Sequence, residues 1–187
     1  MKVNTQELEI IAPKLKTGEK IMLSGYIYTA RDAAHKRFAQ LIKDGKDLPF
    51  KLKNATLYYA GPTGTKDGMV IGSCGPTTSG RMDQYTPMLL DLGLKGIIGK
   101  GERSEEVEKA IIRNNAAYFC AIGGAGALAC KCIKSCEVIA FEDLGCESVK
   151  KLYIENFPLI VTIDCHGGNI FRSGRKQFEK KKTLVNV

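Results

Sequence analysis

The sequence predicts a single α/β domain, which its length, its composition and its alternation of short strands with helices all support. The chain has 187 residues, the size of one ordinary domain with a full hydrophobic core. Hydrophobic residues make up 44% and charged residues 26% of the chain, as in globular rather than disordered proteins. No internal repeat or Pro/Ser-rich linker divides the sequence, so we expect one domain over residues 1–187. Its last residues, 175–187, form a basic tail that we expect to be poorly ordered.

The first half of the chain is expected to begin with a strand and a helix. Residues 20–30 are rich in β-branched and aromatic side chains, which favours a strand, and Gly25 is a candidate β-bulge. The segment from about 31 to 43 has a helical pattern. Hairpin-like strands are then expected at 55–60 and 69–73, separated by a turn-rich segment.

The second half is expected to alternate helices and strands. Ser104 is a good helix N-cap because its hydroxyl can accept hydrogen bonds from free amides, while Glu105 and Glu106 face the positive end of the helix dipole. The expected helices cover about 81–92, 104–114 and 127–132, and the expected strands cover 95–99, 116–122, 136–141 and 158–164.

The charge of the chain limits its possible partners. The 28 Lys and Arg residues exceed the 20 acidic residues, which gives a formal net charge of +8. Such an excess can attract nucleic acid, acidic membranes or small polyanions. However, no stripe of basic residues is interleaved with aromatic ones and tryptophan is absent, so no nucleic-acid partner is expected. No apolar run approaches the roughly 20 residues that span a bilayer, so no membrane partner is expected either.

The N-terminus and the cysteines point to a reducing compartment. Residues 1–7 lack the charged-then-apolar pattern of a secretory signal, so we expect a cytoplasmic protein. The seven cysteines are an odd number and are scattered along the chain. We therefore expect reduced thiols, most of them buried as small hydrophobic side chains.

The most informative motif is Gly75-Pro-Thr-Thr-Ser-Gly-Arg-Met-Asp83, between an expected strand and an expected helix. Its glycines permit a backbone in which consecutive amides point inward as an anion-binding nest. Thr77 and Thr78 add hydroxyls, and Arg81 adds a planar fork that suits two carboxylate oxygens. The alternative is an ordinary strand-to-helix turn in which the hydroxyls only satisfy helix amides.

Two further groups of polar residues stand at the ends of expected strands. Arg31 and His35 are four residues apart and share one face of the expected helix, and Asp32 could hold either of them in place. Alternatively, Arg31 and Asp32 form a surface pair and His35 is partly buried. Lys100 follows the strand at 95–99, and a lysine at the carboxyl end of such a strand can face a ligand crevice or simply be solvated.

Two other patterns resemble cofactor sites but are weaker. The segment 124–129 fits Gly-x-Gly-x-x-Ala, the dinucleotide fingerprint, but too little sequence follows it for the remaining units of a nucleotide-binding fold. We expect a glycine-rich packing turn, or a stretch that faces a substrate. Cys130, Cys132 and Cys136 could ligate zinc or an iron–sulfur cluster, but their spacing matches neither zinc knuckles nor common ferredoxin runs.

Taken together, these stretches resemble the C-terminal region of class I fumarate hydratases and the beta subunits of two-subunit fumarate and L-tartrate dehydratases. The resemblance spans residues 5–172, and its longest motif is specific. The matching stretches are Thr29-Ala-Arg-Asp-Ala-Ala-His35, Gly75-Pro-Thr-Thr-Ser-Gly-Arg-Met-Asp83, Gly99-Lys-Gly101 and the segment at Gly123-Gly124.

The resemblance implies a swivelling β/β/α domain and a reversible hydration of fumarate to L-malate, or the dehydration of tartrate. By that resemblance, Arg31, Arg81 and Lys100 hold the substrate carboxylates, with Thr78 beside them. Thr77 matches a hydroxyl proposed as the base that handles the C3 proton, so Thr77 and Arg81 are the expected catalytic residues. The expected supporting residues are Asp32, His35 and Asp83.

The resemblance also implies a partner. A 4Fe-4S cluster is expected on a larger alpha subunit and none on this chain, whose cysteines do not fall in the cluster motif of the family. The active site would then be completed across a subunit interface, in a heterotetramer or around a homodimer of the beta chain. An alternative of another class is a protein that binds a dicarboxylate without catalysis.

Overall fold

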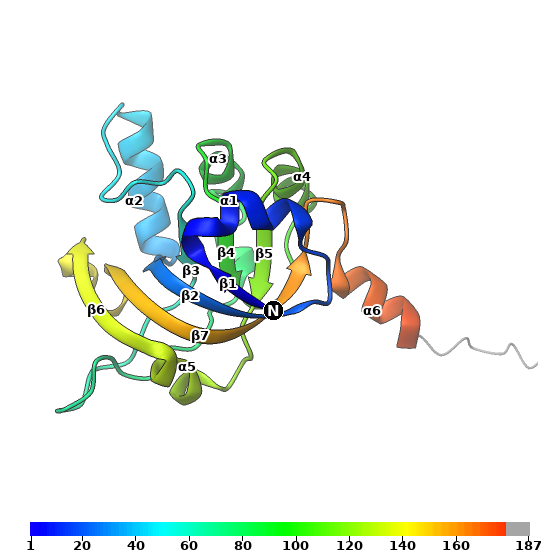
Figure 1. Cartoon of the computed structure of the whole chain (residues 1–187). Coiled ribbons are helices and arrows are strands. Elements are labelled where there is room, and N and C mark those ends of the chain that lie inside the picture. The colour runs from blue at the N-terminus through cyan, green and yellow to red at the C-terminus, as the bar shows by residue number, and fades with distance from the viewer. Residues whose placement is uncertain (179–187) are drawn as a thin grey trace, which may run out of the picture.

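The computed structural model describes residues 1–178, in which helices pack around one β-sheet (Figure 1). Within these residues, seven strands form one sheet in the order β1-β2-β3-β4-β5-β7-β6. The strands are β1 (Lys2–Asn4), β2 (Lys20–Thr29), β3 (Thr56–Tyr58), β4 (Gly96–Gly99), β5 (Ala117–Cys120), β6 (Ile133–Ala140) and β7 (Val149–Ile163). The α-helices are α1 (Leu8–Ile11), α2 (Asp32–Lys43), α3 (Thr86–Asp91), α4 (Glu105–Arg113), α5 (Gly126–Cys132) and α6 (Ile170–Phe178). Short 3-10 helices cover η1 (Thr5–Glu7), η2 (Ala12–Lys14), η3 (Ser79–Met82) and η4 (Glu142–Glu147).

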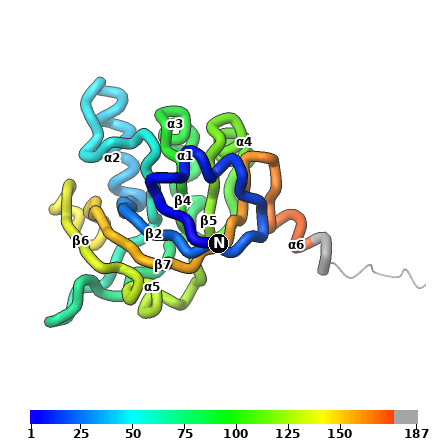
Figure 2. The backbone as a smooth tube through the Cα atoms, in the orientation of Figure 1, coloured from blue at the N-terminus to red at the C-terminus, as the bar shows by residue number. Residues whose placement is uncertain are grey.

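The sheet closes on itself through its longest strand. Strands β1 to β5 pair in parallel, whereas β7 runs antiparallel to β2, β5 and β6. Ile160 of β7 lies opposite Lys20 on one edge and opposite Cys120 on the other, so β2, β3, β4, β5 and β7 form a ring. The chain path in Figure 2 places the N-terminus beside β2 and β7, and the Met22 amide donates to the Met1 carbonyl.

Two apolar clusters fill the two sides of this sheet. Side chains alternate along a strand, so Tyr58 points into the ring while its neighbours Leu57 and Tyr59 point outward. The inward cluster includes Leu23, Ile27, Phe119 and Val161. The outward cluster packs under α2, α3 and α4, which lie on one side of the sheet in Figure 1, and it includes Phe38, Leu89, Ile97 and Val107.

Several expected elements are confirmed. The strand at 20–30 is β2, and its pairing with β7 shifts register between Leu23 and Gly25, which confirms the bulge. A Cβ on Gly25 would lie 2.2 Å from Oγ1 of Thr5, so only glycine fits there. Ser104 caps α4 by accepting a hydrogen bond from the amide of Val107. The other elements that match expected ones are α2, β3, β4, β5, α5 and β6.

The expected early hairpin is wrong. Residues 69–73 form no strand, and Met69 and Val70 are exposed. The loop is instead closed by Thr63, whose amide donates to the Ser73 carbonyl and whose hydroxyl accepts from the Ser73 amide, both at 3.0 Å. Because α2 returns the chain between them, β2 and β3 are parallel, and the antiparallel hairpin is the late pair β6 and β7.

The expected helix at 81–92 is also shorter than predicted. Its first part is the 3-10 turn η3, and α3 begins at Thr86 with Pro87 in its first turn, where a missing N–H costs no hydrogen bond. At the other end of the chain, residues 175–178 of the expected tail belong to α6, and residues 179–187 lie outside the described part. None of the described helices is long and apolar enough to cross a membrane.

Candidate active site

The predicted site residues gather at the carboxyl edge of the parallel strands. Arg31 follows β2, Gly61 follows β3, Lys100 follows β4 and Gly123 follows β5. In a parallel sheet these ends meet at one edge, which is where ligands bind in open α/β folds. A Cβ built on Gly61 would lie 3.0 Å from Cδ of Arg31, and one built on Gly123 would lie 3.9 Å from Cδ of Lys100.

The loop of the glycine–threonine motif lies across the ends of β3 and β4. Pro76 forms an antiparallel bridge with Ala60, and Thr78 forms a parallel bridge with Lys100. The amide of Thr77 donates to the Tyr59 carbonyl at 2.7 Å. The loop therefore brings Thr77 and Thr78 to the edge that Lys100 occupies.

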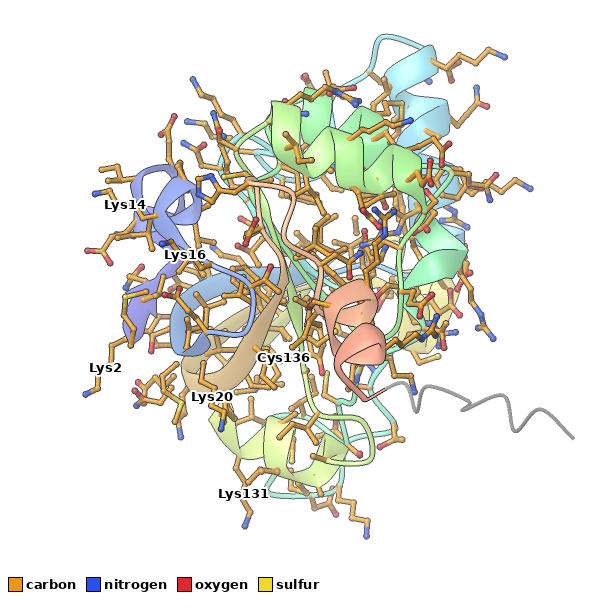
Figure 3. The ribbon with its side chains drawn as sticks, turned by 90° about the vertical axis from the view of Figure 1, so that its right-hand side faces the viewer. Lys2, Lys14, Lys16, Lys20, Lys131 and Cys136 are labelled. Atoms are coloured by element: carbon orange, nitrogen blue, oxygen red, sulfur yellow. The ribbon has the colours of Figure 1, made fainter. Side chains whose placement is uncertain are left out.

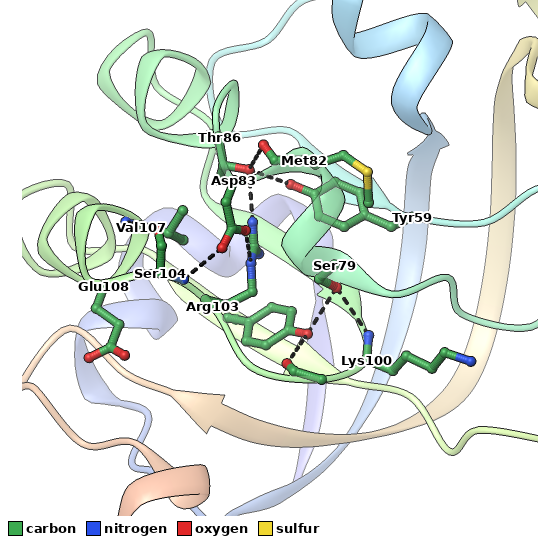
Figure 4. Close-up of polar contacts among 12 residues, drawn as sticks. Tyr59, Ser79, Met82, Asp83, Thr86, Lys100, Arg103, Ser104, Val107 and Glu108 are labelled. Atoms are coloured by element: carbon green, nitrogen blue, oxygen red, sulfur yellow. Dashed lines mark hydrogen bonds and ion pairs between the residues drawn. The ribbon is translucent and has the colours of Figure 1, made fainter.

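Ser79 fixes this loop to β4 (Figure 4). Its amide donates to the Lys100 carbonyl at 2.9 Å, and its hydroxyl accepts from the Lys100 amide at 3.1 Å. The hydroxyl of Tyr118 lies 2.9 Å from both Oγ of Ser79 and the Gly101 carbonyl. A Cβ on Gly99 would lie 1.9 Å from Oγ of Ser79, so the loop can approach β4 this closely only at a glycine.

These bonds modify the predicted anion nest. The amides of Thr77 and Ser79 donate to backbone carbonyls and are not available to an anion. The amides of these two residues therefore cannot contribute to an anion nest. Thr78 is the N-cap residue of η3, but its hydroxyl accepts no hydrogen bond from the amides of η3. The alternative of an ordinary turn capped by this hydroxyl therefore does not hold either.

Two cations at this edge have no partner in the described part of the chain. Arg81 and Lys100 are exposed, and among the side chains of residues 1–175 neither charge finds a hydrogen-bond or ion-pair partner. The hydroxyls of Thr77 and Thr78 likewise make no hydrogen bond within these residues, and Thr77 is partly buried. The edge thus offers two positive charges and two free hydroxyls to a ligand.

Arg31, in contrast, is already paired. Its Nη2 lies 3.1 Å from Oε1 of Glu147 and 3.8 Å from Oδ2 of Asp32, so Glu147 rather than Asp32 is its main partner. The other carboxylate oxygen of Glu147 accepts from the Ala33 amide at 3.3 Å, in the first turn of α2. Nε of Arg31 is buried and has no hydrogen-bond partner among the described residues. The sequence analysis missed Glu147, which lies in η4 far along the chain, and only the fold reveals the pair.

His35 is fully buried behind Arg31 rather than partly exposed. Its Nδ1 lies 2.8 Å from the Arg31 carbonyl, and a carbonyl accepts only from a protonated Nδ1. Burial lowers the pKa of His35 from 6.5 to about 4, so the ring is neutral near pH 7. Its Nε2 is buried and finds no hydrogen-bond partner in the part of the chain that the structure describes, and the ring packs edge-on to Tyr59. His35 supports the backbone of Arg31 and does not reach the edge itself.

Asp83 belongs to a buried network around Arg103 (Figure 4). Its Oδ1 accepts from Nε of Arg103 at 2.7 Å and its Oδ2 accepts from the Ser104 amide at 2.6 Å. Nη2 of Arg103 donates to the Thr86 hydroxyl at 2.8 Å, and the guanidinium lies over the ring of Tyr118. Burial alone would lower the pKa of Arg103, but Tyr59, Asp83 and Tyr118 more than offset it and raise that pKa. The sequence analysis did not identify Arg103, because a lone arginine after a strand has no distinctive pattern.

The glycine-rich segment at 124–129 is a packing turn. Its Gly126 carbonyl accepts from the Cys74 amide at 3.2 Å. A Cβ on Gly126 would lie 2.4 Å from Oγ of Ser73 and 3.1 Å from the amide nitrogen of Gly75. Gly126 therefore allows α5 to approach the start of the motif loop.

The cysteine thiols of α5 lie close to backbone carbonyls of the same helix. Sγ of Cys130 lies 3.0 Å from the Ala127 carbonyl, and burial raises the pKa of Cys132 and of Cys136. Within residues 1–178, no three His, Cys, Asp or Glu side chains lie close enough together to hold a metal ion. The donor set of the described residues does not fit an iron–sulfur cluster.

Comparisons with known proteins agree on one family. Residues 1–174 match the family described as the fumarase C-terminus. Over 181 residues the chain is 38% identical to a putative L(+)-tartrate dehydratase subunit beta from Methanocaldococcus jannaschii, with 93% of both chains covered. It is 40% identical over 155 residues to the anaerobic class I fumarate hydratase of Escherichia coli, and 38% identical over 156 residues to fumarate hydratase 2 of Leishmania major. These two matches cover 82% of the chain but only 28% of each relative.

Proposed function

The chain belongs to the fumarase C-terminal family, and on this premise we propose that it is the smaller subunit of a hydro-lyase. The proposed reaction is the reversible hydration of fumarate to L-malate. The observation that supports it most is that Arg81, Lys100 and the Thr77 hydroxyl have no partner within the described side chains, while Thr78 of the same loop forms a bridge with Lys100.

A dicarboxylate needs at least two positive anchors. We assign this role to Arg81 and Lys100, with Arg31 as a third cation and Thr78 as an added hydroxyl donor. Removing a proton beside a carboxylate builds up negative charge, and fixed cations stabilise it. Because Glu147 neutralises much of the charge of Arg31, we expect Arg31 to orient a carboxylate more than to supply net charge.

Thr77 is the proposed base. In the dehydration direction the ionised oxygen of Thr77 takes the C3 proton of malate while the bond between C2 and its hydroxyl breaks and hydroxide leaves. That hydroxide then takes the proton back from Thr77 to give the water that is released, and hydration reverses both steps. A threonine hydroxyl is a poor base unless nearby cations favour its ionised form. Arg81 and Lys100 are the candidates for that effect.

The chain also needs a partner in this proposal. We expect a larger alpha subunit to hold a 4Fe-4S cluster, which would polarise the substrate hydroxyl as a Lewis acid. The fusion of the matching region to a much longer chain in the fumarate hydratase relatives supports such a partner. We further propose a swivelling β/β/α domain, a cytoplasmic location, and a heterotetramer or a homodimer of this chain as the assembly.

Two alternatives to fumarate hydration are tested by the same experiment. The relative from Methanocaldococcus jannaschii is named a tartrate dehydratase subunit, which makes L-tartrate a second candidate substrate. A protein that binds a dicarboxylate without catalysis would also use the two free cations, but it would have no use for Thr77 as a base.

The test is an anaerobic assay of this chain with and without its larger partner, on fumarate and on L-tartrate in parallel. We expect activity only with both chains, and the faster substrate identifies the reaction. Enzyme-like hydration by the lone chain would overturn the partner-dependent site. Tight binding of malate by the lone chain, with no turnover in the assembled pair, would favour the binding protein.

A further inference from the structure

A second surface of the molecule, along β2 and β7, is apolar and has no role in the proposed reaction. A groove of about 400 Å³ lies on the outer side of β2 and β7. Ile122 and Pro158 also line a shallow hollow beside α5, so the two depressions are continuous. Scattered exposed apolar residues are normal, but a contiguous patch marks an interaction site. The groove is lined by Met1, Lys20, Ile21, Met22, Ile122, Pro158, Leu159 and Ile160.

None of the described side chains, which end at residue 175, covers the groove. Ile122 is 59% exposed, Leu128 of α5 is 51% exposed and Met22 is 42% exposed. Met22 lies opposite Pro158 in the ladder between β2 and β7, so their side chains share the outer face. Helices α2, α3 and α4 pack on the outward cluster at β3, β4 and β5 and leave this face open.

The groove adjoins the candidate active site. Ile122 is followed directly by Gly123, the residue whose added Cβ would lie 3.9 Å from Cδ of Lys100. The turn between β5 and α5 therefore has the groove on one side and Lys100 on the other. A protein that fills the groove would reach the edge where Lys100 and Arg81 lie unpartnered.

The charge around the groove identifies the kind of occupant. Lys20 lines it, and among the described residues no acidic side chain does. Figure 3 shows further lysines along the same side of the molecule, among them Lys2 and Lys131. A second copy docked groove to groove would place its own Lys20 against the first, and like charges at a contact are costly.

We infer that this groove is the docking surface for the larger subunit, through an apolar segment of that subunit flanked by carboxylates. In the fumarate hydratase relatives the matching region makes up 28% of a longer chain, so the remaining chain is available to cover the equivalent face. This inference rests on the proposed function for the identity of the partner. It adds where that partner binds and which chemistry its contact surface has.

The test measures the affinity between the two purified chains by sedimentation, anaerobically and without substrate. Ile122→Asp and Met22→Asp should each weaken binding at least about tenfold, because each places a charge in a desolvated apolar contact. Leu92→Asp is the matched control, since Leu92 is 50% exposed at the end of α3, away from the groove, and it should bind as the unchanged chain does. Thermal unfolding of each variant checks that the fold is kept.

A charge reversal provides an independent arm. Lys20→Glu should weaken binding and flatten its dependence on salt, whereas Lys46→Glu, at an exposed position after α2, should do neither. If Ile122→Asp and Leu92→Asp bind the larger subunit with equal affinity, the inference is overturned. It is also overturned if Ile122→Asp weakens only the association of two copies of this chain. The affinity measurement does not depend on turnover, so the two proposals can fail separately. If the groove variants bind the larger subunit more weakly, but the unchanged pair hydrates no diacid, the docking surface is supported and the proposed function is overturned.

Discussion

The Arg31 guanidinium is held by Glu147, whose two carboxylate oxygens reach Nη2 of Arg31 at 3.1 Å and the Ala33 amide at 3.3 Å. One side chain in η4 thus fixes both the start of α2 and the cation that precedes it. Gly61 limits the guanidinium from another side, because any Cβ there would lie 3.0 Å from its Nη1. The orientation of Arg31 therefore depends on residues from three separate segments.

Removing Glu147 should misplace Arg31 without removing its charge. In the assembled enzyme we expect Glu147→Ala to lower kcat/KM by about tenfold or more, mainly through a higher KM, because a misoriented cation loses ligand binding. Glu147→Gln keeps one acceptor oxygen and should restore part of the loss. Glu137→Gln on the exposed side of β6 is the control. Equal kinetics for Glu147→Ala and the control would show that Arg31 needs no such support.

The depressed pKa of His35 predicts a pH-dependent stability. Below pH 6.5 the unfolded chain binds a proton on His35, whereas the folded chain stays neutral down to about pH 4. Stability is therefore lost as the pH falls through this window, by up to about 3 kcal/mol from this group. Urea unfolding at several pH values should show a flatter slope for His35→Asn, whose amide can still donate to the Arg31 carbonyl. An unchanged slope for His35→Asn would contradict this source of the pH dependence.

The buried Asp83–Arg103 pair should matter far more to stability than an exposed pair of the same kind. We expect Arg103→Ala to cost about 3–5 kcal/mol of unfolding free energy, because it leaves Asp83 charged and unpaired beside the core. The matched control is Arg113→Ala, which breaks the exposed pair with Asp91 and should cost at most about 1 kcal/mol. Chemical denaturation gives both values, and similar costs would contradict the importance assigned to burial.

The contact between Gly99 and Ser79 predicts a local effect on the site. Gly99→Ala should push the motif loop away from β4, lower stability by about 1–3 kcal/mol and reduce kcat in the assembled enzyme. Gly64→Ala, where an added Cβ meets nothing within 4 Å, is the matched control and should change neither quantity. A fully active Gly99→Ala enzyme would mean that the loop position is not critical.

Much of the fold follows from local patterns, and the failures have physical causes. Periodicity predicts α2 and α4, and the capping hydroxyl of Ser104 is where the sequence indicates. The short N-terminal elements were not predicted, because one or two turns carry no clear period. Helix α6 was not predicted because Gly174 and the basic residues after it indicate a tail rather than a helix. The supposed strand at 69–73 has suitable residues, but no neighbouring strand is available to pair with it.

The candidate site divides in the same way. The sequence is enough to predict Thr77, Arg81 and Lys100 as site residues, because the first two stand in one motif and the third follows a strand. Parallel pairing of β3 and β4 then places the motif loop and Lys100 at the same edge of the sheet. Glu147 and Arg103 could not be found from the sequence, because their partners Arg31 and Asp83 are distant in the chain and only the fold brings the charges together.

The most direct measurement is the anaerobic rate of fumarate hydration by this chain paired with its larger subunit, with Thr77→Ala compared with Thr65→Ala. Thr65 lies in the exposed loop after β3 and serves as the matched control. The account predicts a fall in kcat of at least about a hundredfold for Thr77→Ala, the usual cost of losing a general base, and none for Thr65→Ala. A Thr77→Ala enzyme that hydrates fumarate at the rate of the control would contradict the account.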